Sequence, residues 1–340
     1  MTDPAAKPDA TAPPDITPLL SRFPALHVLP RAELGRVAPP IQRDQVPDAG
    51  ELWIWRDDLN APVAAGNKLR ALEWLLGEVR AGHMVATMGG IGSTHVYATA
   101  THASRLGAYT TAVRWPHETT PVTERVGALA ASRCARVHDA PLPIALVHAA
   151  RLRLTTNAAR GRHWVPFGGS SPIGVLGQVN AALELVERVE RGDAPRPAAV
   201  SVPVGSSGTA AGLLLGFAIA GWETQVIGAR CGPRIGITRG RVLRLARRTA
   251  ALVMRLTGQR LPLPRADRLI LEHSAYAGAY GRPHPEAQRL ADSLHERTGV
   301  FLDPTYGAKA LLAARLHLPR IQPLMLWATF DGREMGMGDG

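Results

Sequence analysis

The feature of this sequence that most constrains its fold is a repeated order of strand-like segment, glycine-rich turn and helix-like segment. Residues 85–88 run into Gly-Gly-Ile-Gly, and residues 199–203 run into the turn at 205–209, Gly-Ser-Ser-Gly-Thr. A segment with the apolar spacing of a helix follows each turn. Strands that alternate with helices form parallel sheets flanked by helices. The sequence therefore predicts an α/β fold whose ligands bind at the carboxyl ends of the strands.

Charge and composition exclude several other classes of protein. The formal net charge is +11, but only three of the 39 basic residues are lysine, namely Lys7, Lys68 and Lys309. The densest basic stretch, residues 230–268, alternates arginine with apolar residues, which is typical of an amphipathic helix with a solvated face. An anionic partner or a subunit contact is the alternative for this face. No aromatic residues interleave its arginines, so we expect no nucleic-acid partner.

Location and metal binding are constrained in the same way. No stretch of about 20 residues is apolar enough to span a membrane. Residues 1–20 are rich in Ala, Pro, Asp and Thr, lack a signal-peptide core and are expected to form a disordered leader. Cys134 and Cys231 are too few for a disulfide framework or a metal cluster. We therefore expect no membrane partner, no metal and a cytoplasmic location.

Lys68 is the lysine whose setting suggests chemistry. It follows Gly66-Asn67 where a loop meets a helix, whereas Lys7 lies in the leader. A solvated lysine in a first helical turn is the simpler interpretation. Because arginine replaces lysine almost everywhere else, this amine looks retained for its chemistry. A desolvated lysine can form a Schiff base or release a proton near neutral pH, and arginine can do neither.

Two glycine-rich turns have the composition of anion sites. The turn at 205–209 places three hydroxyl groups and free N–H groups at a helix start, which suits a terminal monophosphate. It lacks the lysine of a nucleotide P-loop, and a tight turn without a ligand is the alternative. The N–H groups of Ser93, Thr94 and His95 similarly suit a carboxylate, and Ser93 could also take part in proton transfer. A plain helix cap is the alternative for Ser93.

Two of the five tyrosines lie in unusual segments. Tyr280 is in a glycine-flanked loop, and Tyr306 begins a helix that contains Lys309. Phenols on loops can act as acids or hold a leaving group. Half-buried structural tyrosines are the alternative interpretation.

The order of these motifs resembles the pyridoxal-phosphate enzymes of the 1-aminocyclopropane-1-carboxylate deaminase and D-cysteine desulfhydrase family, which have the tryptophan synthase β-like fold (fold type II). The collinear order covers about residues 35–330. The motifs are Gly-Asn-Lys at 66–68, Gly-Gly-Ile-x-Ser-x-His at 89–95, Gly-Gly-Ser-Ser-Pro at 168–172, Gly-Ser-Ser-Gly-Thr at 205–209, Ala-Tyr-Gly-Arg-Pro at 279–283 and Leu-Asp-Pro-x-Tyr-x-x-Lys-Ala at 302–310.

The resemblance implies roles for individual residues. Lys68 would hold the pyridoxal 5'-phosphate as a Schiff base and move the substrate proton. Tyr280 and Tyr306 match the family's two active-site tyrosines. The substrate carboxylate would bind to Ser93, Thr94 and His95. The cofactor phosphate would bind to Gly205, Ser206, Ser207, Gly208 and Thr209.

The resemblance also implies two domains with the cofactor between them. The larger domain would comprise residues 21–69 and 179–340. The smaller, inserted α/β domain would comprise residues 70–178. A homodimer is expected.

The departures from the family cluster around the cofactor ring and the substrate. Thr94 stands where the family has Asn, which contacts the ring hydroxyl, and Gly92 stands where it has Gln. Gly307 stands where a Thr or Glu lies near the pyridine nitrogen. Thr329 or Asp331, after the last strand, would be the replacement for that partner.

The expected activity is a lyase or deaminase reaction on a small amino acid, releasing ammonia and a 2-oxo acid, and sulfide from a cysteine-like substrate. His95 favours the desulfhydrase side, because the deaminase has Gln there. A dehydratase or racemase is an alternative within the enzymes. A non-catalytic binding protein with the same fold is a further alternative, because Thr94 and Gly307 alter the ring contacts.

Overall fold

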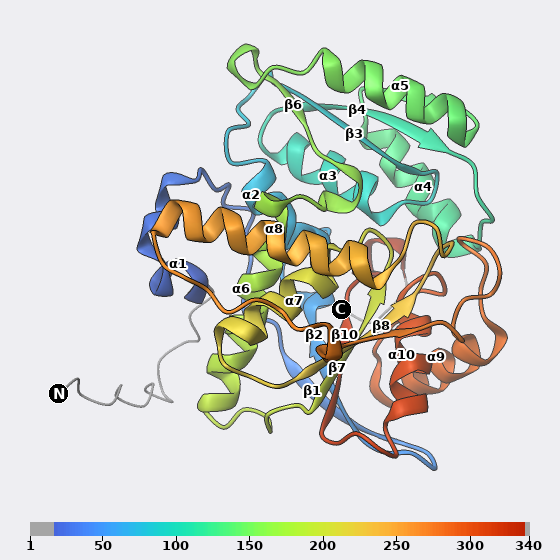
Figure 1. The fold of residues 1–340 in the computed structure, drawn as a ribbon. Coiled ribbons are helices and arrows are strands. Elements are labelled where there is room, and N and C mark those ends of the chain that lie inside the picture. The colour runs from blue at the N-terminus through green and yellow to red at the C-terminus, as the bar shows by residue number, and fades with distance from the viewer. Residues whose placement is uncertain (1–16, 337–340) are drawn as a thin grey trace.

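The computed structural model describes residues 17–336 and contains two β-sheets (Figure 1). The larger sheet has the strand order β1-β2-β10-β7-β8-β9. Its strands are β1 (Ile41–Val46), β2 (Gly50–Arg56), β10 (Leu324–Ala328), β7 (Ala199–Val204), β8 (Gln225–Arg230) and β9 (Leu269–Glu272). β1 and β2 form an antiparallel hairpin, and all other neighbours pair in parallel. β10 therefore lies between two strands from distant parts of the chain.

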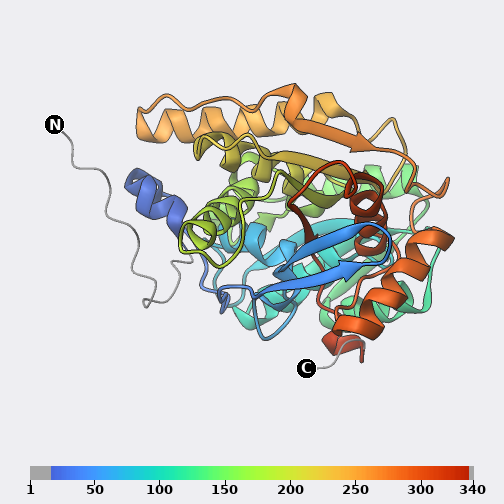
Figure 2. The same ribbon diagram turned by 90° about the horizontal axis from the view of Figure 1, so that it is seen from below.

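Helices cover both faces of this sheet, and Figure 2 shows α8 and α9 on opposite sides of it. One face packs against α6 (Pro172–Glu190), α7 (Gly208–Ile219) and α8 (Arg239–Thr257). The other packs against α9 (Pro285–Thr298) and α10 (Gly307–His317). Side chains alternate between faces along a strand. In β7, Val200 and Val202 therefore join the first core and Ala199 joins the second, which explains its continuous apolar sequence.

The smaller sheet is entirely parallel, with the order β5-β4-β3-β6. Its strands are β3 (Met84–Gly90), β4 (Tyr109–Trp115), β5 (Arg136–Asp139) and β6 (Arg162–Trp164). Val85 and Ala112 face the core shared with α3 (Thr94–Arg105) and α4 (Pro121–Arg133). Met88 and Val113 face α5 (Leu142–Leu154). The predicted α/β class with parallel sheets is confirmed.

Two short N-terminal elements complete the fold. α2 (Asn67–Leu75) packs against α6 and leads into the smaller sheet. α1 (Pro18–Arg22) also packs on α6, with Leu19 and Leu20 buried. Residues 18–20 of the predicted leader 1–20 are therefore helical, because Pro18 suits a first helical turn and the two leucines gain a core contact. Residues 1–16, which include Lys7, lie outside the described part of the chain.

The domain boundaries remain a prediction, with the strands of the smaller sheet all inside the segment 70–178. α8 carries the expected basic face, since its arginines are exposed and its larger apolar residues are buried or half-buried against the core. None of the helices within residues 17–336 is long and apolar enough to cross a membrane.

Candidate active site

Three helices begin at one cavity between the two sheets. α2 contributes Asn67 and Lys68, while α3 and α7 contribute their first residues. Free N–H groups and the positive end of each helix dipole therefore converge there. The wall is completed by the loop before α6, the start of α10 and the segment after β10. The lining residues are Asn67, Lys68, Ser93, Thr94, His95, Phe167, Gly168, Pro203, Gly205, Ser206, Ser207, Gly208, Thr209, Tyr306, Thr329 and Phe330.

The turn between β7 and α7 has unsatisfied polar groups. Ser207 caps α7 in the left-handed conformation, with φ of 78°, and its side chain makes no capping hydrogen bond. Its Oγ is buried without a hydrogen-bond partner within the described residues. Buried polar groups in native proteins are nearly always paired, so an unpaired one indicates a ligand or water. Together with the free N–H groups of α7, this turn fits the phosphate of a cofactor.

A second glycine-rich loop lies against this turn. Ser170 Oγ donates to Ser206 Oγ at 2.7 Å. Gly168 has φ of 64°, and a Cβ built on it would lie 2.1 Å from Ser206 Oγ. A Cβ on Gly208 would lie 2.7 Å from Ser170 Oγ. The two loops can approach only because these positions lack side chains. The motif at 168–172 is recognisable in the sequence, but the sequence predicts no role for Gly168 or Ser170.

The start of α2 is fixed to both sides of the cavity. A Cβ on Gly66 would lie 2.2 Å from the carbonyl oxygen of Thr329, and the N–H of Asn67 donates to that oxygen at 3.2 Å. Asn67 Nδ2 donates to Thr209 Oγ1 at 2.9 Å. Asn67 thus links the lysine helix to the phosphate-type turn. Sequence reasoning missed this role, and its only signal was the position next to Lys68.

Lys68 itself presents a reactive amine to the cavity. Its Nζ makes no hydrogen bond within the described residues. Burial lowers the pKa of Lys68 to about 8, although the Asp303 carboxylate opposes the shift. A substantial fraction of the amine is therefore neutral near physiological pH, which is the form that acts as nucleophile or base.

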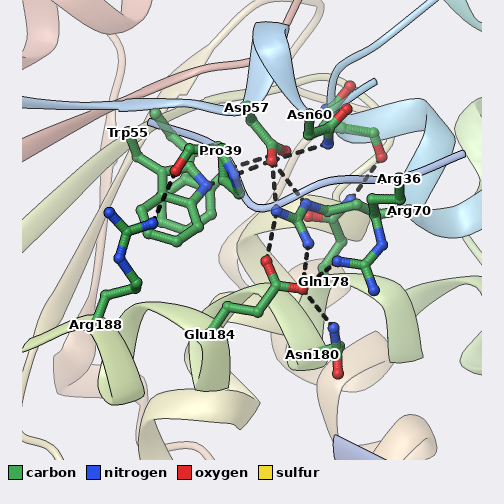
Figure 3. Close-up of polar contacts among 12 residues, drawn as sticks. Arg36, Pro39, Trp55, Asp57, Asn60, Arg70, Gln178, Asn180, Glu184 and Arg188 are labelled. Carbon is green, nitrogen blue, oxygen red and sulfur yellow. Dashed lines mark hydrogen bonds and ion pairs between the residues drawn. The ribbon is translucent and has the colours of Figure 1, made fainter. Parts of the chain in front are cut away.

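A buried ionic network anchors α2, the helix that carries Lys68, and Figure 3 shows the residues at its centre. Arg70 donates to Asp57 at 2.7 Å and to the two oxygens of Glu184 at 3.0 and 2.9 Å. Arg36 pairs with Glu184 and, at 2.8 Å, with Glu73 of α2. The network thereby joins the end of β2 to α2 and α6.

Asp57 connects this network to the residue that precedes α2. Its carboxylate also accepts hydrogen bonds from the indoles of Trp55 and Trp327 and from Asn60 Nδ2. Asn60 Oδ1 in turn accepts the N–H of Gly66 at 2.9 Å. A continuous set of hydrogen bonds therefore extends to within two residues of Lys68.

The turn before α3 places the other predicted residues in the cavity wall. Ser93 is the N-cap of α3, and its Oγ accepts the N–H of Val96 at 3.4 Å. Thr94 lines the cavity with a hydroxyl that has no hydrogen bond within the described residues. His95 Nε2 lies 3.0 Å from Thr87 Oγ1. Burial and the charge of Lys68 lower the pKa of His95 to about 3, so the ring is neutral.

The two predicted tyrosines meet at the cavity. Their hydroxyl groups are hydrogen-bonded to each other, and Tyr306 lines the wall. Burial raises the pKa of Tyr280 to about 12 and that of Tyr306 well above 10, so both phenols stay protonated. Asp303 fixes the turn by accepting the N–H groups of Thr305, Tyr306 and Gly307. The hydrogen bond between the two hydroxyl groups uses one of their two protons. The other proton can be donated into the cavity.

Of the two residues expected as replacement partners for the cofactor's ring nitrogen, Thr329 and Asp331, only Thr329 lines the cavity. Asp331 is bound to Arg333 and to the N–H of Ala65, and it does not line the cavity. Thr329 does line it, and its hydroxyl has no hydrogen bond within the described chain. A Cβ on Gly307 would lie 3.2 Å from Leu302 Cβ, so this position is closely packed against the protein.

The fold and the cavity define a pyridoxal-phosphate enzyme, and comparison with known proteins agrees. The chain matches the model of the family "Pyridoxal-phosphate dependent enzyme" over residues 38–324 and belongs to that family. It is 40% identical to a nocardicin C-9' epimerase from Nocardia uniformis subsp. tsuyamanensis, over 76% of this chain and 79% of the relative. It is 28% identical to a D-cysteine desulfhydrase from Serratia proteamaculans, over 86% of this chain and 87% of the relative.

A solved structure gives the same result. The crystal structure of an ACC deaminase homologue superposes with a TM-score of 0.73 at 25% identity, covering 91% of this chain and 94% of the other. The predicted family resemblance, the fold, the cofactor and the classification as an enzyme are confirmed. Within residues 17–336 no group of three metal-ligating side chains forms a metal site.

Proposed function

We propose that this enzyme is a pyridoxal-phosphate-dependent lyase or deaminase that acts, with water, on a small amino acid by elimination or ring opening. The products are ammonia, a 2-oxo acid and, from a cysteine-like substrate, sulfide. The observation that carries the proposal is the amine of Lys68. It has a pKa of about 8 and lies in the same cavity as a helix start with an unpaired hydroxyl, Ser207. An amine beside a phosphate-type turn is what the cofactor requires of a protein.

The cofactor supplies an electron sink for a carbanion next to the substrate amino group. Lys68 would hold the cofactor through its amine, and the same amine, when free, would take the proton from the substrate α-carbon. The N–H groups of Thr94 and His95 would orient the substrate carboxylate. The expected N–H of Ser93 is not free, because it donates to the carbonyl oxygen of Gly90 at 3.0 Å, so Ser93 would contribute its hydroxyl group instead. The protonated pair of Tyr280 and Tyr306 donates a proton to the leaving group. Thr94, Thr329 and the turn at 205–209 would complete the cofactor site, with Thr329 as the candidate partner of the ring nitrogen and the turn as the candidate phosphate site.

Epimerisation is the second candidate, because the relative with 40% identity is named an epimerase. Lys68 would begin this reaction with the same proton transfer. The proton would then return to the opposite face of the α-carbon, so a second acid is needed. Tyr306, which lines the cavity and stays protonated, is the candidate for that acid.

The first experiment is an absorption spectrum of the purified protein with added pyridoxal phosphate. We expect a visible band that borohydride removes and that Lys68→Ala lacks. Lys309→Met is the matched control, because Lys309 is also buried but lies outside the cavity lining, and it should keep the band. A wild-type protein that stays colourless would contradict the proposal.

The second experiment separates the two reactions. D- and L-amino acids are incubated with the enzyme in deuterium oxide. Release of a 2-oxo acid with ammonia supports the lyase. Inversion of the substrate with one deuterium at the α-carbon, and no 2-oxo acid, supports the epimerase instead.

We also propose that the enzyme is a homodimer. The exposed apolar side chains of α5 support this, because a monomer rarely leaves such a patch uncovered. They are Leu142, Ile144, Leu146, Val147 and Leu154, which are 46–86% exposed. Sedimentation velocity of the wild type and of Leu146→Glu tests the proposal, and a monomeric wild type would contradict it.

A further inference from the structure

Two loops meet at the edge of the site, one after β4 and one at residues 278–282. Arg282 and Glu118 form an ion pair with two hydrogen bonds, one of them from Nε to Oε2 at 2.7 Å. Both side chains are about half exposed, at 50% and 43%. A pair this exposed contributes little stability by itself. The residue before Glu118, His117, makes contacts that are more informative about the site.

His117, which precedes Glu118, makes three different contacts. Its ring packs edge-on against Tyr280 with 4.8 Å between centroids. Its Nε2 accepts the N–H of Gly92 at 3.2 Å, and its Nδ1 lies 2.7 Å from the carbonyl oxygen of Glu118. A ring that accepts at Nε2 carries its proton at Nδ1 and donates it to that carbonyl. These hydrogen bonds therefore select one neutral tautomer.

The surrounding backbone leaves room for this ring only because glycines face it. A Cβ on Gly90 would lie 2.5 Å from His117 Cδ2 and 3.2 Å from Tyr280 Cε1. A Cβ on Gly281 would lie 2.0 Å from the carbonyl oxygen of Glu118. Real Cβ atoms essentially never approach another heavy atom this closely, so a side chain at Gly90 or Gly281 would displace the ring or the backbone beside it.

We infer that His117 is a positioning residue that couples the turn before Ser93 to Tyr280, with the Glu118–Arg282 pair closing the edge of the site beside it. The inference rests on the proposed function, in which Ser93 and Tyr280 act on opposite ends of the substrate. By holding the Gly92 N–H, His117 fixes the direction of the next N–H groups in the turn. By packing on Tyr280, it fixes the phenol that is hydrogen-bonded to Tyr306.

The coupling depends on the protonation state of the ring. The titratable and charged groups that face His117 are Glu118 on its own loop and Tyr280 and Arg282 on the opposite loop. Arg282 lowers the pKa of Glu118, so that pair stays charged, and Tyr280 stays neutral. Burial lowers the pKa of His117 below its usual 6.5, although the Glu118 carbonyl opposes the shift. Below that pKa an N–H replaces the lone pair at Nε2 and faces the Gly92 N–H, so the contact breaks as pH falls.

Two substitutions in the holoenzyme distinguish the effect of the hydrogen bond between His117 and Gly92 from the effect of protonating His117. His117→Gln keeps an acceptor at a similar reach but does not titrate. His117→Phe keeps the aromatic contact with Tyr280 but has no acceptor. His27→Gln, at an exposed position outside the site and outside α5, is the matched control. The readouts are the pH profile of kcat/KM, the cofactor absorption band and the dissociation constant of an α-methyl amino acid.

We expect kcat/KM of the wild type to fall on the acid side of pH 6.5, as the His117 ring takes up a proton. We expect His117→Gln to retain most of the activity at pH 8 and to lack this fall. We expect His117→Phe to lose about 2- to 12-fold in kcat/KM at pH 8, the equivalent of one neutral hydrogen bond. It should bind the α-methyl analogue more weakly while keeping the cofactor band. The control should match the wild type throughout.

An unchanged acid limb in His117→Gln overturns the inference, and so does a His117→Phe enzyme that equals the wild type. If His117→Phe does not bind the cofactor, the His117→Gln profile decides. A wild type that turns over no amino acid refutes the proposed function instead. The tautomer is then still measurable by nitrogen-15 NMR of the holoprotein, where a proton on Nε2 of His117 at pH 8 would overturn the inference.

Discussion

Replacing Arg70 with methionine should lower the free energy of unfolding by about 3–5 kcal/mol, the usual loss when one partner of a buried ion pair is removed. Arg70 is fully buried and makes three hydrogen bonds to Asp57 and Glu184, of 2.7, 3.0 and 2.9 Å. At about 1.5–3 kcal/mol for a hydrogen bond to a charged group, these would be worth about 4.5–9 kcal/mol. The expected loss is smaller, because Trp55 and Trp327 still donate to Asp57, and other donors remain near Glu184.

Unfolding in urea at neutral pH, without cofactor, measures this loss as a shift in the midpoint at constant slope. Arg43→Met is the control, because Arg43 is 63% exposed and pairs with Glu51 at 3.3 Å. It should lose less than about 1 kcal/mol. A loss in Arg70→Met no larger than in Arg43→Met would refute the view that the network anchors α2.

Three further predictions concern the cavity. Gly168→Ala should weaken pyridoxal phosphate binding about tenfold or more, because its Cβ would lie 2.1 Å from Ser206 Oγ at a φ of 64°. Unchanged affinity in a fluorescence titration would show that the two loops separate freely. Ser207→Gly should stabilise the cofactor-free protein by about 1 kcal/mol, since it relieves a left-handed serine, yet bind the cofactor less tightly; a lower melting temperature would contradict the strain argument. The rate at which the cofactor-free protein regains its visible band should rise between pH 7 and 9, because the lowered pKa of Lys68, about 8, makes the amine neutral over that range; a flat rate would contradict that pKa.

Local patterns account for most of what could be predicted from the sequence. The strand-like segments at 85–88 and 199–203, the glycine-rich turns that follow them and the helix start at Lys68 are visible in the sequence. All of these depend on neighbouring residues, whose spacing and turn chemistry can be seen in the chain. The gathering of these turns at one cavity also follows, because parallel strands present their carboxyl ends together.

Contacts between distant segments could not be predicted in this way. Glu184 lies on a helix where a charge ordinarily indicates the solvent side, but it is buried by Arg36 and Arg70. His117 packs against Tyr280, which lies 163 residues later in the chain, and nothing in the sequence around either residue predicts this contact. The same holds for the placement of β10 beside β2. Pairing of this kind leaves no periodic trace in the sequence.

The central position of β10 has a consequence for how the chain is made. Synthesis proceeds from the N-terminus, and domains generally fold as units as they emerge. All four strands of the smaller sheet exist once residue 164 has been added, whereas β2 and β7 lack their shared neighbour until residues 324–328 follow. Thr329 and Phe330, which complete the cavity wall, come later still. Lys68 is therefore synthesised long before the residues that enclose it, and we expect the cofactor to bind only after residues 324–330 have been added.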